Sequence, residues 1–279
     1  RFAPDLIGFS ATTNQYPYVE QYAGWVKERF DVPIVCGGIH PTMSPEEVIA
    51  DKHIDMVCIG EGEYPLLELA DGLENGKNIC GIKNLWVKEA GTVHRNEMRP
   101  LIANLDELPF PDRDLFRYGD MLEKFSSRAE GKKVGEIMTG RGCPFHCTYC
   151  CNHALRELYH DLGSYVRRRS VENVLDEVAQ LIEKYGVDWL IFDDDTFTLH
   201  PQWIAEFCRQ YPTRFSVPFQ CNAFPSTLNP EIVRKLRDAG CVRVAVGIET
   251  GNEWLRKEVL KRPLSDEQIK SVLAFIKQS

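Results

Sequence analysis

The sequence has no long apolar run, no excess of basic residues and too few cysteines for a disulfide scaffold. Hydrophobic residues make up 43% and charged residues 27% of the 279 positions, which is the composition of a folded globular chain. Without about 18 consecutive apolar residues, no membrane-spanning helix is expected. The formal net charge of −8 gives no long-range attraction to nucleic acid or to an anionic membrane surface.

The N-terminus lacks the basic, apolar and small-residue pattern of a secretory signal. Ten cysteines in the whole chain are too sparse for a disulfide scaffold, so we expect a reducing, cytoplasmic environment. The first region also lacks Gly-x-Gly-x-x-Gly, which argues against a nicotinamide-binding domain. The chain begins with Arg1 and stops within a helical pattern, and we expect it to be part of a longer protein.

Residues 1–90 alternate short apolar strands with amphipathic helices. The predicted strands are 5–10, 33–36 and 55–60, and the predicted helices are 18–30, a helix capped by Ser44, and 64–74. This alternation predicts a parallel, doubly wound α/β sheet. Ligands bind outside the carboxyl ends of strands in such sheets, and here those ends carry small, polar and glycine-rich residues.

The pattern weakens after residue 75, with a faint hairpin signal at 85–94, and we predict a linker over 91–133. Alternation returns with predicted strands at 134–139, 189–192, 215–221 and 242–248, each followed by a helix. The clearest helix follows a predicted N-cap at Ser170. Because a full eight-unit barrel needs about 250 residues, residues 134–279 can form only a partial βα barrel.

Cys143, Cys147 and Cys150 follow the strand at 134–139 with the spacing Cys-x3-Cys-x2-Cys. Three thiolates on one loop can bind three irons of a cuboidal cluster that normally takes four cysteines, which leaves one iron open for another ligand. Structural zinc is the alternative. It would need a fourth ligand such as Cys151, His146 or His153, but the usual second metal-binding pair is missing. We expect Cys151 not to be a ligand.

This loop resembles the signature of the radical S-adenosylmethionine (radical SAM) superfamily, with Tyr149 as the aromatic residue before the last cysteine. The resemblance implies that Cys143, Cys147 and Cys150 hold a [4Fe–4S] cluster. It also implies that SAM chelates the open iron, and that one electron cleaves SAM to methionine and a 5′-deoxyadenosyl radical. An electron donor such as flavodoxin or ferredoxin would supply that electron.

Two later strand ends resemble SAM-contacting segments of this superfamily. The run Asp193-Asp194-Asp195-Thr196-Phe197 implies that Asp194 or Asp195 binds the SAM amino group. The segment from Gly247 to Gly251 resembles Gly-Ile-Glu-Ser-Gly, and implies that Glu249 contacts the ribose hydroxyls, with Gly247 and Tyr149 beside SAM.

Other interpretations of these acidic residues remain open. They could be acids at the start of the following helices. A haloacid-dehalogenase pair is disfavoured because Phe197 stands where Thr or Val is expected, and a Mg²⁺ site has no phosphate loop to support it. The basic run 165–169 is predicted to be a solvated or ion-paired rim rather than a nucleic-acid site, although one arginine could meet the SAM carboxylate or an anionic substrate.

The strand ends of the first region resemble the cobalamin-binding Rossmann-like domain of cobalamin-dependent radical SAM enzymes. The residues that carry this likeness, and that it implies as cobalamin contacts, are Ser10, Thr12, Gly37, Gly38, His40, Gly60, Glu61 and Gly62. Ser10 could bind the nucleotide tail, and the glycines would let backbone approach a flat ligand. Thr12 replaces the family's Leu, and His40 is not the cobalt ligand by position.

Taken together, the resemblance implies an α/β enzyme with three parts: a partial Rossmann-like cobalamin-binding domain (1–90), a linker (91–133) and a partial, C-terminally incomplete radical SAM barrel (134–279). Its implied reaction is methylation of an unactivated carbon of a small molecule. Radical ring closure of a porphyrin ester is the alternative within the family. A non-catalytic zinc or iron–sulfur binding module is the alternative outside it.

Overall fold

The computed structural model describes residues 3–126 and 131–278 and divides the chain into two compact units, 1–102 and 103–279. The segment predicted as a linker contributes a strand to the first unit and a helix to the second, and its residues 127–130 lie outside the described residues. Among the helices of the described residues, none is long and apolar enough to cross a membrane.

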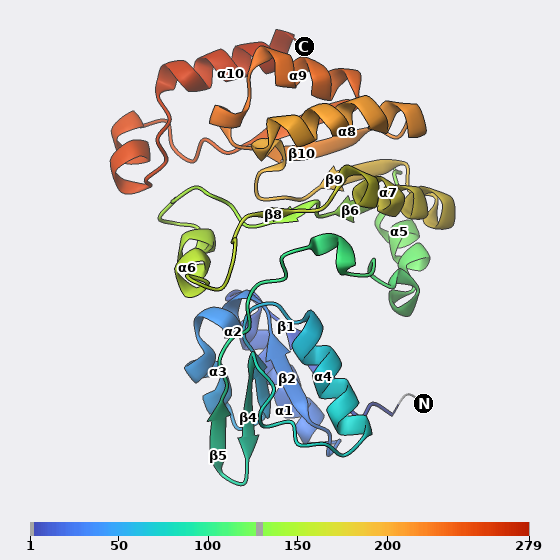
Figure 1. Cartoon of the computed structure of the whole chain (residues 1–279), viewed down its shortest axis with the longest axis vertical. Coiled ribbons are helices and arrows are strands. Elements are labelled where there is room, and N and C mark those ends of the chain that lie inside the picture. Colours follow the sequence, from blue (N-terminus) through green and yellow to red (C-terminus); the bar gives the residue numbers. More distant parts are fainter. Residues whose placement is uncertain (1–2, 127–130, 279) are drawn as a thin grey trace. The chain divides into compact units, whose positions relative to one another are not determined.

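The first unit is a five-stranded sheet with helices on both faces (Figure 1). Its strands, in spatial order, are β1 (Ile7–Ser10), β2 (Ile34–Gly37), β3 (Met56–Cys58), β4 (Leu85–Glu89) and β5 (Thr92–Arg95). Its helices are α1 (Tyr16–Lys27), α2 (Ile39–Met43), α3 (Pro45–Ala50) and α4 (Glu63–Glu74). The first three strands are parallel, and β4 and β5 return as an antiparallel hairpin.

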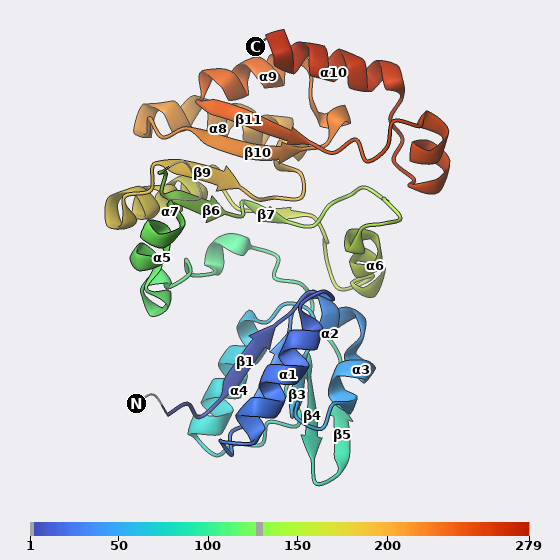
Figure 2. The same cartoon turned by 180° about the vertical axis from the view of Figure 1, so that it is seen from behind.

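Both faces of this sheet are buried because successive side chains of a strand point to opposite sides. Ile34 and Val57 pack with α1 and α3, whereas Val35 and Met56 pack with α4. Figures 1 and 2 show α4 and α1 on opposite faces. Burial on both faces explains why the central parallel strands β2 and β3 are apolar rather than alternating.

Two details of the first unit differ from the prediction. The order of the described strands follows the chain, without the reversal of a doubly wound sheet, because β4 and β5 return as a hairpin. Ser44 makes no capping hydrogen bond through its side chain, since it lies between α2 and α3 and ends one helix as it begins the next.

The second unit contains a four-stranded, all-parallel sheet, whose strands run across the view one above another in Figure 2. The spatial order is β11 (Cys241–Val246), β10 (Phe219–Ala223), β9 (Trp189–Phe192) and β6 (Val134–Ile137). Neighbouring strands follow one another in the chain and are joined by helices, which confirms the predicted partial βα barrel. The helices between or after these strands are α7 (Val171–Tyr185), α8 (Pro201–Arg214) and α9 (Pro230–Asp238).

The remaining elements complete the second unit. They are the 3-10 turns Leu105–Glu107, Arg113–Phe116, Phe197–Leu199 and Pro225–Thr227, helices α5 (Tyr118–Ser126), α6 (Cys151–Leu158) and α10 (Asp266–Gln278), the π-helical turn Leu255–Val259, and the two-residue strands β7 (Gly140–Arg141) and β8 (Arg167–Arg168). The predicted N-cap of α7 is confirmed, because the Ser170 side chain accepts a hydrogen bond from the Asn173 N–H. The core between sheet and helices is aromatic, with Phe192, Phe207 and Phe219 fully buried.

Candidate functional site

The cysteine loop leaves the sheet through a turn that requires glycine. After β6, the strand β7 pairs antiparallel with β8, and Gly142 follows with a φ of +85°. A Cβ at this position would lie 2.4 Å from the carbonyl oxygen of Tyr165. Only glycine combines this backbone conformation with such a close approach. Gly142 therefore sets the turn at which the cysteine loop begins.

The three cysteines predicted as cluster ligands line one cavity of about 420 Å³. The cavity opens at the carboxyl ends of β9, β10 and β11, where a partial barrel places its ligands. Its lining residues are Cys143, Phe145, Cys147, Tyr149, Cys150, Asn152, Asp195, Thr196, Asn222, Ala223, Phe224, Ala245, Val246, Gly247, Glu249 and Arg262. The structure therefore brings together side chains that are up to 119 residues apart between Cys143 and Arg262.

Each thiol of the loop has a polar neighbour. The Asn152 amide donates to Cys150 Sγ at 3.5 Å, and Arg262 Nη1 donates to Cys147 Sγ at 3.5 Å. Cys143 Sγ lies 3.8 Å from the Thr196 hydroxyl. Donors of this kind stabilise the negative charge of thiolates and of the cluster that they hold. The donor set thus fits a three-cysteine [4Fe–4S] cluster.

The residues considered as a fourth ligand lie elsewhere. Cys151 is exposed at the first position of α6. His146 contacts Arg156, and His153 Nδ1 lies 2.6 Å from the carbonyl oxygen of Cys150. None of the three is among the residues that line the described cavity.

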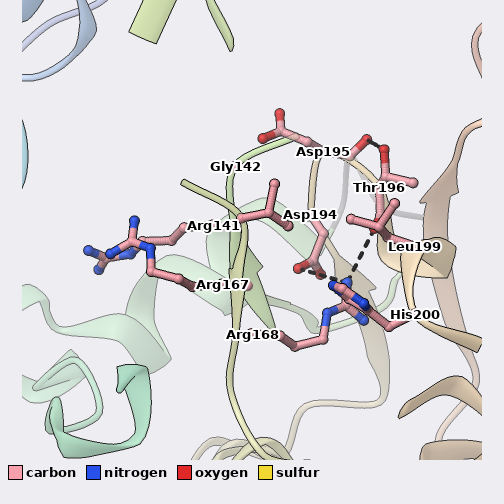
Figure 3. A pocket seen from close by; sticks show the side chains of 11 residues that line it. Arg141, Gly142, Arg167, Arg168, Asp194, Asp195, Thr196, Leu199 and His200 are labelled. Atoms are coloured by element: carbon pink, nitrogen blue, oxygen red, sulfur yellow. Dashed lines mark hydrogen bonds and ion pairs between the residues drawn. The ribbon is translucent and has the colours of Figure 1, made fainter. Parts of the chain in front are cut away.

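Asp194 and Asp195 point in different directions (Figure 3). Asp194 is 3% exposed, accepts hydrogen bonds from the Thr139 N–H and hydroxyl, and lies 3.8 Å from Arg168. Burial raises the pKa of Asp194, and Arg168 and Thr139 oppose that rise. Asp195 instead lines the cavity beside the cysteines. Of the two carboxylates, only that of Asp195 borders the cavity.

Glu249 has a strained backbone at the cavity. Its φ of +71° lies in the left-handed region, where a residue with a side chain is uncommon outside functional sites. The neighbouring Gly247 offers its carbonyl oxygen to Arg262 Nη2 at 2.7 Å, and a Cβ at Gly247 would lie 2.5 Å from Glu249 Oε1. The segment therefore directs both a backbone carbonyl and a carboxylate toward the cavity side.

Tyr149 connects the cysteine loop to this segment. Its hydroxyl accepts a hydrogen bond from Arg262 Nη1 at 3.1 Å. Burial raises the pKa of the Tyr149 phenol, and the neighbouring Cys147 and Glu249 add to that effect. The predicted SAM-side residues Tyr149, Gly247 and Glu249 thus form one contiguous group.

Arg262 is a site residue that sequence reasoning missed. It is 6% exposed, its guanidinium lies 4.1 Å from the centre of the Phe224 ring, and its Nε has no hydrogen-bond partner within the described residues. Phe224 in turn stacks on Phe145 of the cysteine loop. No motif marks this arginine, because its partners lie between 15 and 115 residues away in the chain.

The basic run 165–169 is ion-paired, as predicted. Arg168 lies beside Asp194, donates to the carbonyls of Thr196 and Phe197, and stacks over Trp203. Arg169 pairs with Glu177 of α7. The charges of Arg168 and Arg169 are therefore paired within the protein rather than offered to a nucleic acid.

In the first unit, the predicted cobalamin contacts Ser10, Gly37, Gly38 and Gly60 lie at the carboxyl ends of β1, β2 and β3. Gly38 has a φ of +99°, and a Cβ there would lie 2.8 Å from the Ala11 nitrogen. The Thr42 hydroxyl donates to the Gly38 carbonyl and accepts from the Gly60 N–H. Thr42, which the sequence did not single out, thereby ties two of the loops together.

The remaining predicted contacts differ in exposure. Thr12 is exposed and bonds to Gln15. His40 is 5% exposed and packs against Tyr16 with ring centres 4.4 Å apart. Glu61 accepts a hydrogen bond from the Ile102 N–H, which holds the loop that contains Gly62.

Comparison with known proteins defines the class. Residues 137–279 match the family model of the radical SAM superfamily, and residues 1–70 match that of the B12 binding domain. The chain belongs to the family of cobalamin-dependent radical SAM enzymes. The cofactors of this family are a [4Fe–4S] cluster, SAM and cobalamin, which confirms what the motifs implied.

Three relatives cover nearly the whole chain. An uncharacterized methyltransferase of Pyrococcus horikoshii is 32% identical over 275 residues, which are 98% of this chain and 57% of the relative. The cytidylyl-2-hydroxyethylphosphonate methyltransferase of Streptomyces wedmorensis is 27% identical, over 98% of this chain and 55% of its own. The anaerobic magnesium-protoporphyrin IX monomethyl ester cyclase of Rubrivivax gelatinosus is 26% identical, over 99% and 49%. The chain spans about half the length of these relatives.

Solved structures confirm the fold. The radical SAM methyltransferase TsrM from Kitasatospora setae, solved with cobalamin and a [4Fe–4S] cluster, aligns with a TM-score of 0.76 at 18% identity over 99% of this chain and 57% of its own. The cobalamin-dependent radical enzyme OxsB, solved with aqua-cobalamin and SAM, aligns with a TM-score of 0.73 at 22% identity over 98% of this chain and 39% of its own.

Proposed function

We propose that this chain carries the cobalamin-binding and SAM-cleaving parts of an enzyme that methylates an unactivated carbon of a small molecule. The observation that carries the proposal is the single cavity in which three cysteines meet Asp195, Glu249 and Arg262. Two of the relatives are named as methyltransferases, which favours methylation among the reactions of the family.

Cys143, Cys147 and Cys150 would hold the cluster, and Asn152 and Arg262 would donate hydrogen bonds to its sulfur ligands. When bound, the cluster supplies the electron that cleaves SAM to methionine and a 5′-deoxyadenosyl radical, and methylcobalamin supplies the methyl group. The stacked rings of Phe145 and Phe224 form an apolar wall of the same cavity, and such a wall would help to protect reactive species from water.

Asp195 is the carboxylate that we assign to the SAM amino group, because it faces the cavity while Asp194 is buried against Arg168. Glu249 offers two carboxylate oxygens to the ribose diol. Tyr149 and Gly247 lie beside Glu249, and both accept hydrogen bonds from Arg262. A cavity of about 420 Å³ is within the size range of small-molecule sites.

For cobalamin we assign the loops after β1, β2 and β3. Ser10 would bind the nucleotide tail, and Gly37, Gly38 and the 60–62 loop would form the surface on which the flat ring lies. The left-handed backbone of Gly38, where a Cβ has no room, and its hydrogen bond with Thr42 give that surface a fixed shape. Thr12 and Glu61 lie on the neighbouring loops, whereas the buried position of His40 suits a supporting role.

The test is anaerobic incubation of the reconstituted protein with cob(I)alamin, a reductant and SAM labelled in its methyl group. We expect labelled methylcobalamin and, separately, 5′-deoxyadenosine, both detected by chromatography. Cys147→Ala should abolish 5′-deoxyadenosine while retaining cobalamin absorbance. Absence of labelled methylcobalamin from a protein that binds both cofactors would contradict methylation.

The second candidate is radical ring closure of a porphyrin ester, which the likeness to the Rubrivivax cyclase favours. It needs no methyl transfer, so the same experiment would yield 5′-deoxyadenosine without labelled methylcobalamin. A non-catalytic zinc or iron–sulfur module would yield neither product. A flavodoxin or ferredoxin as electron donor and a cytoplasmic location stay predictions that accompany the main proposal.

A further inference from the structure

A cysteine, a glutamate and a histidine meet on one face of the β4–β5 hairpin in the first unit. His94 of β5 pairs with Val87 of β4, two residues before Glu89. Because side chains alternate along a strand, Glu89 and His94 share the face of Val87. Cys80, from the loop before β4, packs in the same buried cluster as Val87.

Their ligand atoms are close enough for one metal ion. The Cys80 sulfur, a Glu89 oxygen and a His94 ring nitrogen all lie within 4.8 Å of one another, and His94 Nε2 is 3.8 Å from Glu89 Oε2. Bond lengths of about 2.3 Å to sulfur and 2.0–2.2 Å to nitrogen and oxygen place tetrahedral zinc ligands roughly 3.3–3.8 Å apart. Small side-chain rotations would therefore close the site.

The cysteine is held in place by its backbone. The Cys80 N–H donates to Asn78 Oδ1, and its carbonyl oxygen accepts from Asn96 Nδ2, which also donates to the Leu85 carbonyl. The backbone of Cys80 is therefore held against the hairpin that carries the other two groups. Such preorganisation is what a metal site needs from its surroundings.

The cluster is separate from the cobalamin-binding loops. Since β4 runs antiparallel to β3, with Leu85 opposite Cys58 and Val87 opposite Met56, Glu89 lies toward the amino-terminal end of β3. The loops with Ser10, Gly38 and Gly60 lie at the carboxyl ends of the parallel strands. Cys143, Cys147 and Cys150, the predicted ligands of the iron–sulfur cluster, are not part of this group.

We propose that Cys80, Glu89 and His94 bind a zinc ion that ties the hairpin to the loop before β4. Thiolate and imidazole ligands select zinc over magnesium or calcium. Cys80 is buried and Glu89 is exposed, so the fourth position faces solvent and would take a water molecule. The competing explanation is a hydrogen-bonded trio that needs no metal.

The test is equilibrium dialysis of Zn²⁺, against a competing chelator, with the protein whose [4Fe–4S] cluster is already assembled, followed by zinc-edge X-ray absorption. We expect one zinc per chain at this site, with one sulfur and nitrogen or oxygen neighbours. Cys80→Ser should remove the sulfur neighbour and weaken zinc binding at least tenfold, and His94→Gln should weaken it without removing sulfur. Cys208→Ser is the matched control, because Cys80 and Cys208 are both 8% exposed.

Zinc with only oxygen and nitrogen neighbours in the unsubstituted protein would overturn the proposal. So would equal zinc affinity of Cys80→Ser and Cys208→Ser. Circular dichroism would establish that the Cys80→Ser protein is folded, so that the comparison of zinc affinities is decisive.

Discussion

Asp194 and Asp195 are neighbours in the chain with opposite roles in the structure. Asp194 is buried against Arg168 and Thr139, whereas Asp195 borders the cysteine cavity. We predict that Asp194→Ala lowers the free energy of unfolding by about 3 kcal/mol, because it leaves a buried arginine without its charge partner. Asp195→Ala should leave stability unchanged and weaken SAM binding roughly tenfold, as loss of a charge-assisted hydrogen bond does.

Urea denaturation and a SAM titration of both variants check this pair. The assignment fails if Asp195→Ala binds SAM normally, or if Asp194→Ala is as stable as the unsubstituted protein. The sequence could not separate the two residues, since adjacent positions after a strand differ only in the side to which they point.

Arg262 places a positive charge at the cysteine loop through its hydrogen bond to Cys147 Sγ. Donors to cluster sulfurs stabilise the reduced, more negative state. We predict that Arg262→Gln lowers the reduction potential of the cluster by roughly 50 mV, the equivalent of about tenfold in a one-electron equilibrium. Arg262→Lys should lower it less, because it keeps the charge.

A redox titration followed by electron paramagnetic resonance measures these potentials. Identical potentials for the three proteins would show that Arg262 acts only as a packing residue. Sequence reasoning had no access to this contact, because 115 positions separate Arg262 from Cys147.

At the scale of elements, Glu177 of α7 joins two segments that the sequence did not connect. Its carboxylate pairs with Arg113, from the region predicted as a linker, and with Arg169, at the end of the basic run. All three side chains are nearly buried. The paired charges explain why residues 103–126 pack with the second unit.

We predict that Glu177→Ala lowers the free energy of unfolding by about 4 kcal/mol, because two buried arginines would lose their partner. Glu172→Ala, an exposed position in the first turn of the same helix, should change it by less than about 0.5 kcal/mol. Thermal or urea denaturation of both variants decides the matter, and equal stability of the two would refute the structural role of Glu177.

The elements that the sequence predicted well are those with local signals. Helix α7 has a cap at Ser170 and an apolar repeat, and the central strands β2, β3 and β9 are short apolar runs. The hairpin β4–β5 gave only a faint signal because its pairing with β3 depends on the tertiary register. Ser44 was expected to cap α3 through its side chain. It ends α2 as well as beginning α3, and its side chain makes no capping hydrogen bond.

At the scale of the whole molecule, the resemblance of the motifs to a known family identified both units and their cofactors. The Cys-x3-Cys-x2-Cys loop follows a strand, and its three thiols face the ends of the later strands. The glycines after β2 and β3 were informative for a similar reason, since Gly38 has no room for a Cβ. The motifs could not supply the contacts between segments, represented by the bond of Thr42 to Gly60 in the first unit and that of Arg262 to Cys147 in the second.

The central claim is that Cys143, Cys147 and Cys150 hold a cluster with one iron open to SAM. Anaerobic iron and sulfide analysis, with electron paramagnetic resonance of the reduced protein before and after SAM is added, tests it most directly. The account predicts about four irons per chain and a spectrum that changes on addition of SAM. Zinc in place of iron, or a cluster whose spectrum does not respond to SAM, would contradict it.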